Sequence, residues 1–179
     1  MSNLIKSIAV TAFFILLGCN NKPSLQQYFV KNQNNASFVA MDIAPSILKL
    51  DKAKLTSKET EVLASFEKMN VLAFKVSKSN KNSYQTEFSK LAKIVSDTTT
   101  YHQLIKFGSK IEGASISFVG NEDHINEFVI IANQKDRGFA VVRILGNNMK
   151  AENAMSLFSI LQKSVIDKEQ IDILKNIMQ

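Results

Sequence analysis

The densest group of side chains that could bind a metal ion is Glu122-Asp123-His124, with Glu127 close behind. Carboxylate oxygens and imidazole nitrogens are common ligands of divalent cations. The group falls at an expected hairpin turn and strand start, where residues three apart point to opposite faces. We therefore expect a solvated turn and no bound metal, and keep a metal- or carboxylate-dependent hydrolase as the alternative.

No other pattern in the chain predicts catalysis. The chain has two histidines, and His102 stands outside any metalloprotease or triad pattern. Gly113-Ala114-Ser115-Ile116-Ser117 lacks the second glycine of a nucleophile elbow, and no glycine-rich phosphate loop is present. We expect a protein that is not an enzyme and needs no cofactor. A pair of carboxylates that meet only in the folded chain is left open.

Cys19 carries the sole thiol of the chain and directly follows an apolar stretch. Met1–Lys6 carries one positive charge, and Ile8–Leu17 is the stretch of ten residues. It is shorter than the about 20 residues that span a bilayer. A short basic start followed by such a stretch is typical of a secretory signal. We expect residues 1–18 to be a signal peptide that is cleaved between Gly18 and Cys19.

The residues Leu16-Leu17-Gly18-Cys19 resemble the lipobox of bacterial lipoproteins. In those proteins the Cys thiol receives a diacylglyceryl group and the Cys becomes the first mature residue. The resemblance implies that Cys19 carries two or three acyl chains, such as palmitate, and anchors the protein firmly in a membrane. The mature domain then has no thiol, which excludes thiolate catalysis, a Cys-ligated zinc and a disulfide.

Length and charge restrict the partners. The chain has 179 residues, 45% of them hydrophobic, which is enough for one domain with its own core. Lys plus Arg is 22 and Asp plus Glu is 16, so the net charge is +6. Lysines between residues 49 and 93 could form one basic surface for anionic lipid headgroups or glycans. Export, two arginines and no tryptophan argue against nucleic acid.

The patterns predict an α+β fold, with one mostly antiparallel sheet and helices packed on one face. Capping boxes at Ser24–Gln27 and Thr56–Glu59 predict two helix starts. An apolar stripe predicts a helix from Tyr84 to Val95. We expect residues 19–23 to be the lipidated Cys and a tether, and residues 24–179 to be a single domain.

Six β-like runs supply the expected sheet. The last four are separated by short turns, which predicts an antiparallel meander. Apolar residues from Val62 to Met69 lie at helical spacing and precede the second strand. Further helices are expected around Ala154–Val165 and after Asp167. The expected strands cover residues 38–43, 71–76, 103–107, 114–119, 125–132 and 139–145.

The order of these elements resembles a family of small Bacteroidetes envelope proteins that carry a domain of unknown function, number 4252. The resemblance covers residues 24–165 and implies no catalytic residues, because the family has no assigned activity. The frequent position of its genes near sigma-factor regulators implies an envelope-signalling context. The features that carry the resemblance are Tyr28-Phe29, Phe38–Ile43, Leu63–Val76, Tyr101-His102-Gln103-Leu104, Ile116–Val119, Glu127-Phe128-Val129-Ile130-Ile131 and Leu145-Gly146.

Two short patterns resemble export features of Bacteroidetes proteins. Surface lipoproteins carry acidic residues after the Cys, whereas Asn20-Asn21-Lys22-Pro23-Ser24 has none, which favours the periplasmic side of the outer membrane. Asp97-Thr98-Thr99 matches an O-glycosylation pattern with Thr98 as acceptor. We expect a lipid-anchored, non-catalytic domain that binds an envelope protein or glycan. The alternatives are the hydrolase and a carrier of a small apolar ligand between sheet and helices.

Overall fold

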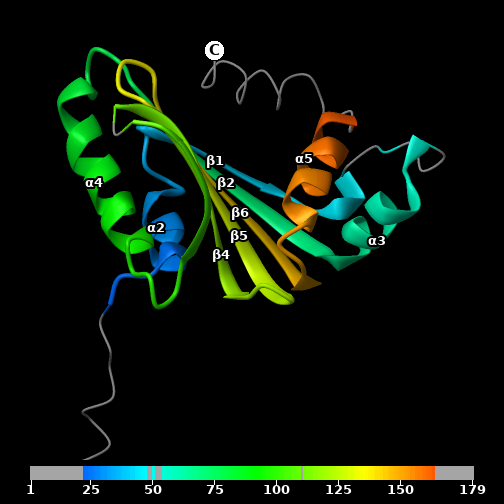
Figure 1. Ribbon diagram of the computed structural model, residues 1–179. Coiled ribbons are helices and arrows are strands. Elements are labelled where there is room, and N and C mark those ends of the chain that lie inside the picture. Colours follow the sequence, from blue (N-terminus) through cyan, green and yellow to red (C-terminus); the bar gives the residue numbers. More distant parts are fainter. Residues whose placement is uncertain (1–21, 48–49, 51–53, 110, 164–179) are drawn as a thin grey trace, which may run out of the picture.

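The structure, a computed structural model, describes residues 22–47, 50, 54–109 and 111–163 (Figure 1). The helices of this part are α2 (Leu25–Asn32), α3 (Ser57–Ser65), α4 (Tyr84–Val95) and α5 (Asn153–Lys163). The strands are β1 (Phe38–Ile43), β2 (Phe66–Lys75), β3 (His102–Gly108), β4 (Glu112–Asn121), β5 (His124–Gln134) and β6 (Gly138–Met149). Two short 3-10 helices span Pro45–Ile47 and Lys81–Ser83.

The six strands pair in one antiparallel sheet in the order β1-β2-β6-β5-β4-β3. The last four in the chain form the expected meander, because short turns join each strand to the next. β2 pairs with the other side of β6, and β1 pairs with β2 at the margin of the sheet. The predicted α+β class with a mostly antiparallel sheet is therefore confirmed.

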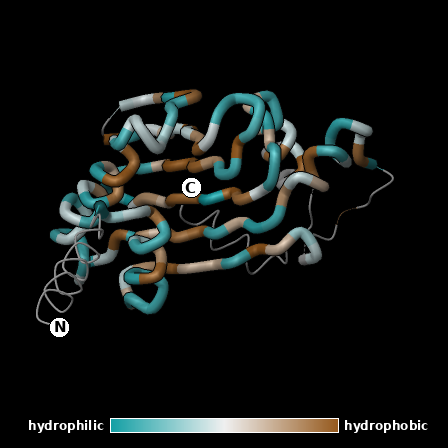
Figure 2. The backbone as a smooth tube through the Cα atoms, turned by 90° about the horizontal axis from the view of Figure 1, so that it is seen from below, coloured by the Kyte–Doolittle hydropathy of each residue, from teal (hydrophilic) through white to brown (hydrophobic). Residues whose placement is uncertain are grey.

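The sheet has two apolar faces, because successive residues of a strand point to opposite sides. The first face carries Leu72 and Phe74 of β2 and is covered by α2 and α4. The second face carries Val71 of β2 and Phe128 of β5, and α3 and α5 cover part of it. Figure 1 shows the two helix pairs on opposite sides of the sheet, and Figure 2 shows hydrophobic residues along its strands.

The prediction that the helices pack on one face is wrong in this detail. In β2 every residue from Met69 to Phe74 is buried, so this strand is shielded from water on both sides. Strands of this kind require a covering layer on each face. The apolar run at Val71–Val76 indicated a buried strand, but it did not indicate how many helical layers cover it.

The helices and strands begin and end where the sequence predicts, except where strands distant in the chain pair. Both capping boxes form: Ser24 Oγ accepts from the N–H of Gln27 at 3.2 Å, and Thr56 Oγ1 accepts from the N–H of Glu59 at 3.2 Å. The helix expected to reach Met69 ends at Ser65, because the chain then pairs with β6. β6 likewise continues to Met149. The helix expected after Asp167 lies outside the described residues.

Aromatic rings fill the core of the first face. The rings of Phe74 and Phe139 stack with centroids 5.4 Å apart, and Phe38 meets Phe74 edge-on at 5.2 Å. Such pairs contribute about 0.5–1.5 kcal/mol each beyond the area they bury. Close approach of β6 to β2 requires a glycine at 138, where φ is +137° and a Cβ would lie 1.8 Å from the carbonyl oxygen of Phe74. This core holds α2 and α4 against the sheet.

Candidate functional site

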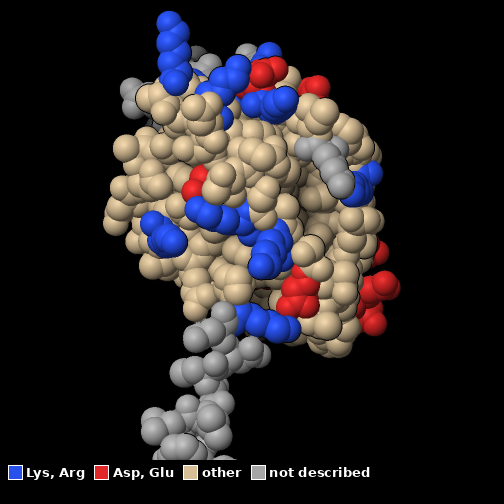
Figure 3. Space-filling view, turned by 90° about the vertical axis from the view of Figure 1, so that its left-hand side faces the viewer, with Lys and Arg blue, Asp and Glu red and all other residues tan. Residues whose placement is uncertain are grey.

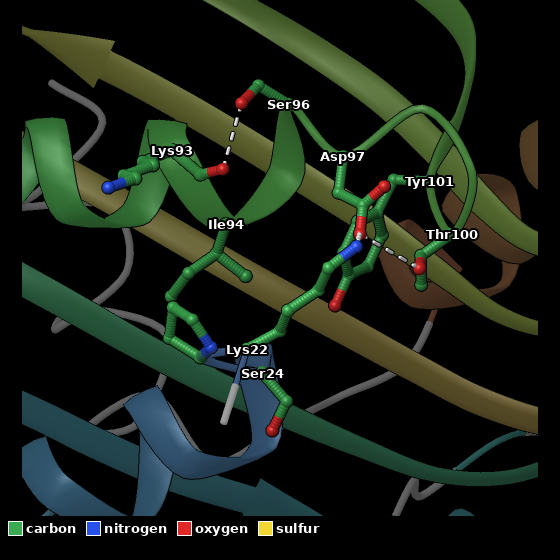
Figure 4. Close-up of a pocket in the computed structure, with 9 residues that line it drawn as sticks. Lys22, Ser24, Lys93, Ile94, Ser96, Asp97, Thr100 and Tyr101 are labelled. Atoms are coloured by element: carbon green, nitrogen blue, oxygen red, sulfur yellow. Dashed lines mark hydrogen bonds and ion pairs between the residues drawn. The ribbon is translucent and has the colours of Figure 1, made fainter. Parts of the chain in front are cut away.

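A hollow of about 420 Å³ lies where the N-terminal tether meets the C-terminal end of α4 (Figure 4). It is open to solvent and brings together residues from the tether, from α4 and from the turn before β3. Its lining residues are Lys22, Pro23, Ser24, Lys93, Ile94, Ser96, Asp97, Thr100 and Tyr101. Lys22 and Pro23, the last two residues of the expected tether, thus lie against the domain at this hollow.

Local hydrogen bonds hold both walls of this hollow. Ser24 caps α2 and thereby sets the direction in which the tether leaves the domain. In the turn after α4, Asp97 Oδ1 accepts from the hydroxyl of Thr99 at 2.6 Å and from its N–H at 3.2 Å. These hydrogen bonds hold the pKa of Asp97 below its usual value. Lys22 Nζ lies 3.8 Å from Asp97 Oδ2 and joins the two walls.

The ionisable residues that line the hollow are Lys22, Lys93, Asp97 and Tyr101. Asp97 is engaged by its own turn, and burial raises the pKa of Tyr101, so its phenol stays protonated at neutral pH. The two ammonium groups of Lys22 and Lys93 leave the hollow with an excess of positive charge. The hollow lies at the end of the domain, whereas the carrier alternative expects an apolar ligand between the sheet and its helices. The described residues between the sheet and its helices form the two hydrophobic cores.

The four candidate metal ligands do not come together. Glu122 and Asp123 are exposed in the turn between β4 and β5, and His124 Nδ1 lies 3.3 Å from Asn121 Oδ1. Glu127 lies on the first face, where its carboxylate is bound by Arg143. Among the described residues, no group of three or more His, Cys, Asp or Glu side chains could hold a metal ion. No geometry in this part of the chain supports the metal-dependent hydrolase.

Sequence reasoning missed the pair formed by Arg143 and Glu127. Arg143 Nε lies 2.7 Å from Glu127 Oε1, and Nη2 lies 3.0 Å from Oε2. The guanidinium also donates to Gln26 of α2 and lies over the ring of Phe29, 5.5 Å from its centroid. The available signal was a charged residue at an inward position of the apolar run Phe139–Leu145. The pair attaches α2, and with it the tether, to the centre of the sheet.

The lysines expected to form one basic surface lie on both sides of the sheet. Lys54 and Lys58 belong to the α3 side, whereas Lys90 and Lys93 belong to α4. Lys58 Nζ lies 3.3 Å from Glu152 Oε1, and Lys90 Nζ lies 2.6 Å from Glu87 Oε1. Figure 3 shows the α4 side, where basic side chains are interspersed with acidic ones. Lys49 and Lys52 lie outside the described residues.

The predicted modification sites have different outcomes. Thr98 is exposed in the turn after α4, where an enzyme could reach its hydroxyl, and its glycosylation stays a prediction. Gly18 and Cys19 lie outside the described residues, so cleavage and lipidation also stay predictions. Within the described ranges, no helix has the length and apolar character needed to cross a membrane.

Comparison with known proteins defines the family of this chain. No curated protein and no solved structure matches it. The model of the family described as "Domain of unknown function (DUF4252)" matches residues 28–177. This range runs from α2 past the end of α5 and therefore includes every strand of the sheet and both helical layers. The chain belongs to the DUF4252 family.

Proposed function

We propose that this protein is anchored by a lipid on Cys19 to the periplasmic side of the outer membrane. Its domain binds another envelope component, a protein or a glycan with negative charge, and catalyses no reaction. The observation that carries the proposal is that the tether and a basic surface lie at opposite ends of α4. This helix has 12 residues and is about 18 Å long at 1.5 Å per residue.

The tether end of α4 suits a position against a membrane. Lys22 follows Cys19 by three residues, and three extended residues span at most about 10 Å. Lys22 and Lys93, both exposed, lie around the hollow at this end. A lipid on Cys19 would hold them next to the headgroups, where each Lys contributes about 1 kcal/mol of attraction to an anionic surface.

The other end of α4 carries the distal basic surface, which consists of Lys75, Lys78, Lys81, Lys135 and Arg137. The loop before α4 and the turn between β5 and β6 are joined by a hydrogen bond from the N–H of Val76 to the carbonyl of Arg137 (2.8 Å). All five side chains are exposed, and Asp136 is the one carboxylate in these two segments. In Figure 3 several basic side chains gather at the top of the view, with acidic ones among them.

The charge of the distal basic surface indicates the chemistry of its partner. Five cationic groups and one carboxylate attract an anionic molecule and exclude a cationic one. An acidic glycan or an acidic protein surface fits this pattern, whereas the hydrolase and the apolar carrier do not use it. A domain held at one end by a lipid presents this surface away from the membrane.

The mass of the intact protein extracted from host membranes tests the anchor. We expect the mass of residues 19–179 plus two or three acyl chains, and an unacylated, uncleaved chain for Cys19→Ser. A wild-type mass without acyl chains would contradict the anchor. Protease added to intact cells should leave the protein whole and should degrade it once the outer membrane is permeabilised. Degradation in intact cells would contradict the periplasmic position.

Binding to heparin, used as a polyanion probe, tests the distal basic surface. Lys78→Glu/Lys81→Glu should weaken binding by about tenfold or more, because two attractions become repulsions. Lys58→Glu/Lys68→Glu is the matched control, since it changes the charge equally but away from the distal basic surface, in α3 and near the other end of β2. Both of its lysines form exposed ion pairs of little energetic weight. Equal loss in the two variants would show nonspecific attraction and contradict the proposed surface.

A further inference from the structure

Four alanines lie side by side across the second face of the sheet. Antiparallel register places Ala73 opposite Ala140, Ala140 opposite Ala132, and Ala132 opposite Ala114. These residues, here called the alanine row, come from four adjacent strands. The next residues on the same face toward α5 are larger: Val71, Val142, Ile130 and Ile116. The alanine row is therefore a shallow trough beside an apolar ridge.

The alanine row lies outside the core that α3 and α5 form with the sheet. Ala73 and Ala140 are 1% and 8% exposed and contact each other as a cluster separate from that core, whereas Ala114 and Ala132 are partly exposed. Beyond Ala114, Phe107 is 61% exposed, and Ile111 in the following turn is 62% exposed. A contiguous apolar trough that ends in large exposed side chains indicates a surface that another segment covers.

We propose that the C-terminal segment 165–178 of this same chain docks in the alanine row as an amphipathic helix. This segment lies outside the described residues, and its sequence carries Ile171, Leu174, Ile177 and Met178 on one helical stripe. A helix over 167–178 would be about 18 Å long. The alanine row crosses four strands, which is about 14 Å at the usual strand spacing. The stripe and the trough therefore match in length.

Helix α5 leads the chain onto the face of the sheet that carries the alanine row. The N–H of Ala151 donates to the carbonyl of Glu122 at 3.2 Å, which fixes the start of α5 beside the turn between β4 and β5. From there α5 turns back from the end of β6 (Figure 1). Its buried residues Leu157 and Ile160 belong to the core of the second face. The chain after Lys163 therefore continues on the side of the sheet that carries the alanine row.

The range of residues that the family model matches favours this segment as the occupant over a second copy of the chain or a foreign partner. The family match runs to residue 177 and therefore includes the segment after Lys163. The segment is thus part of the domain that the family shares. Covalent continuity also gives it a high effective concentration at the trough. The inference is independent of the lipid anchor and of the distal basic surface.

Disulfide cross-linking in the full chain tests the docking. With Cys19→Ser as background, Ala132→Cys/Leu174→Cys should form an intramolecular disulfide at least tenfold faster than Ala132→Cys/Asn176→Cys. Position 176 lies on the polar side of the expected helix and serves as the matched control. Pairs of Leu174→Cys with Ala114→Cys and Ala140→Cys extend the series. Equal rates at 174 and 176, an intermolecular disulfide, or no disulfide in any pair would overturn the proposal.

Thiol labelling gives a second measurement that needs no disulfide geometry. Ala132→Cys should react with a maleimide at least tenfold faster in a chain that ends at Lys163 than in the full chain. Thr98→Cys, which is exposed in the turn after α4 on the other side of the sheet, should react equally in both. Circular dichroism verifies that the shortened chain is folded. If a folded shortened chain shows no faster labelling at 132, the segment does not cover the row.

Discussion

Both carboxylate oxygens of Glu127 accept hydrogen bonds from the guanidinium of Arg143, at 2.7 Å and 3.0 Å. The two side chains are 12% and 7% exposed and come from the adjacent strands β5 and β6. Because α2 covers them and Gln26 shares the guanidinium, the pair connects the sheet to the helix that begins at the tether. The pair thus links the core of the sheet to α2, the helix that directly follows the proposed lipid anchor and tether.

Removing one member of this pair should destabilise the domain strongly. Arg143→Met or Glu127→Gln should lower the free energy of unfolding by about 3–5 kcal/mol, since each leaves an uncompensated polar partner in a buried place. The double variant Arg143→Met/Glu127→Leu should be less destabilised than the sum of the singles. Urea unfolding measures all three. Lys58→Ala, which breaks an exposed pair, should cost less than about 1 kcal/mol and is the control.

Gly138→Ala should disrupt the contact between β2 and β6. Its φ of +137° disfavours any other residue, and the added Cβ would meet the carbonyl oxygen of Phe74 at 1.8 Å. We expect a loss of more than about 2 kcal/mol in the free energy of unfolding. Lys135→Ala in the same turn is exposed and should change it by less than about 0.5 kcal/mol. A Gly138→Ala protein as stable as its parent would show that the strands can separate there without cost.

The turn after α4 should lose stability in acid through Asp97. Hydrogen bonds from Thr99 lower the pKa of this carboxyl. A carboxyl with a depressed pKa in the folded state stabilises it above the unfolded pKa and loses that effect as the pH falls through the folded pKa. The difference in urea midpoint between wild type and Asp97→Asn should therefore be constant near neutral pH and shrink below about pH 4. A difference that grows in acid would contradict the assignment.

The turn between β4 and β5 should bind no metal. Native protein should contain zinc, manganese and nickel far below one equivalent by elemental analysis. His124→Ala should unfold at a urea concentration close to that of wild type, because the residue is exposed and its ring lies within hydrogen-bond distance of Asn121 in its own turn. Stoichiometric metal that disappears in His124→Ala would instead revive the hydrolase alternative. Asn121→Ala is the companion variant, since its side chain caps the turn through the N–H groups of Asp123 and His124.

Features that depend on neighbouring residues could be predicted from the sequence. The capping boxes at Ser24 and Thr56 form because donor and acceptor lie three residues apart. The range of β1 and that of α4 agree with the predicted ones, because turn residues and a strong apolar stripe delimit them. The meander follows from short turns, which leave antiparallel pairing as the available connection. The resemblance to the family was also visible in these local patterns.

Features that depend on distant pairing were decided by the tertiary structure. The helix ending at Ser65 continues as β2 because β6, more than 60 residues later, supplies hydrogen bonds that override the helical spacing up to Met69. Glu127 was a candidate metal ligand in the sequence and is the partner of Arg143 in the fold. Helical layers on both faces, and the tether and the distal basic surface at opposite ends of α4, likewise arise only when the strands pair into one sheet. Local sequence specifies where the helices begin, but long-range strand pairing decides where α3 ends and which side chains meet.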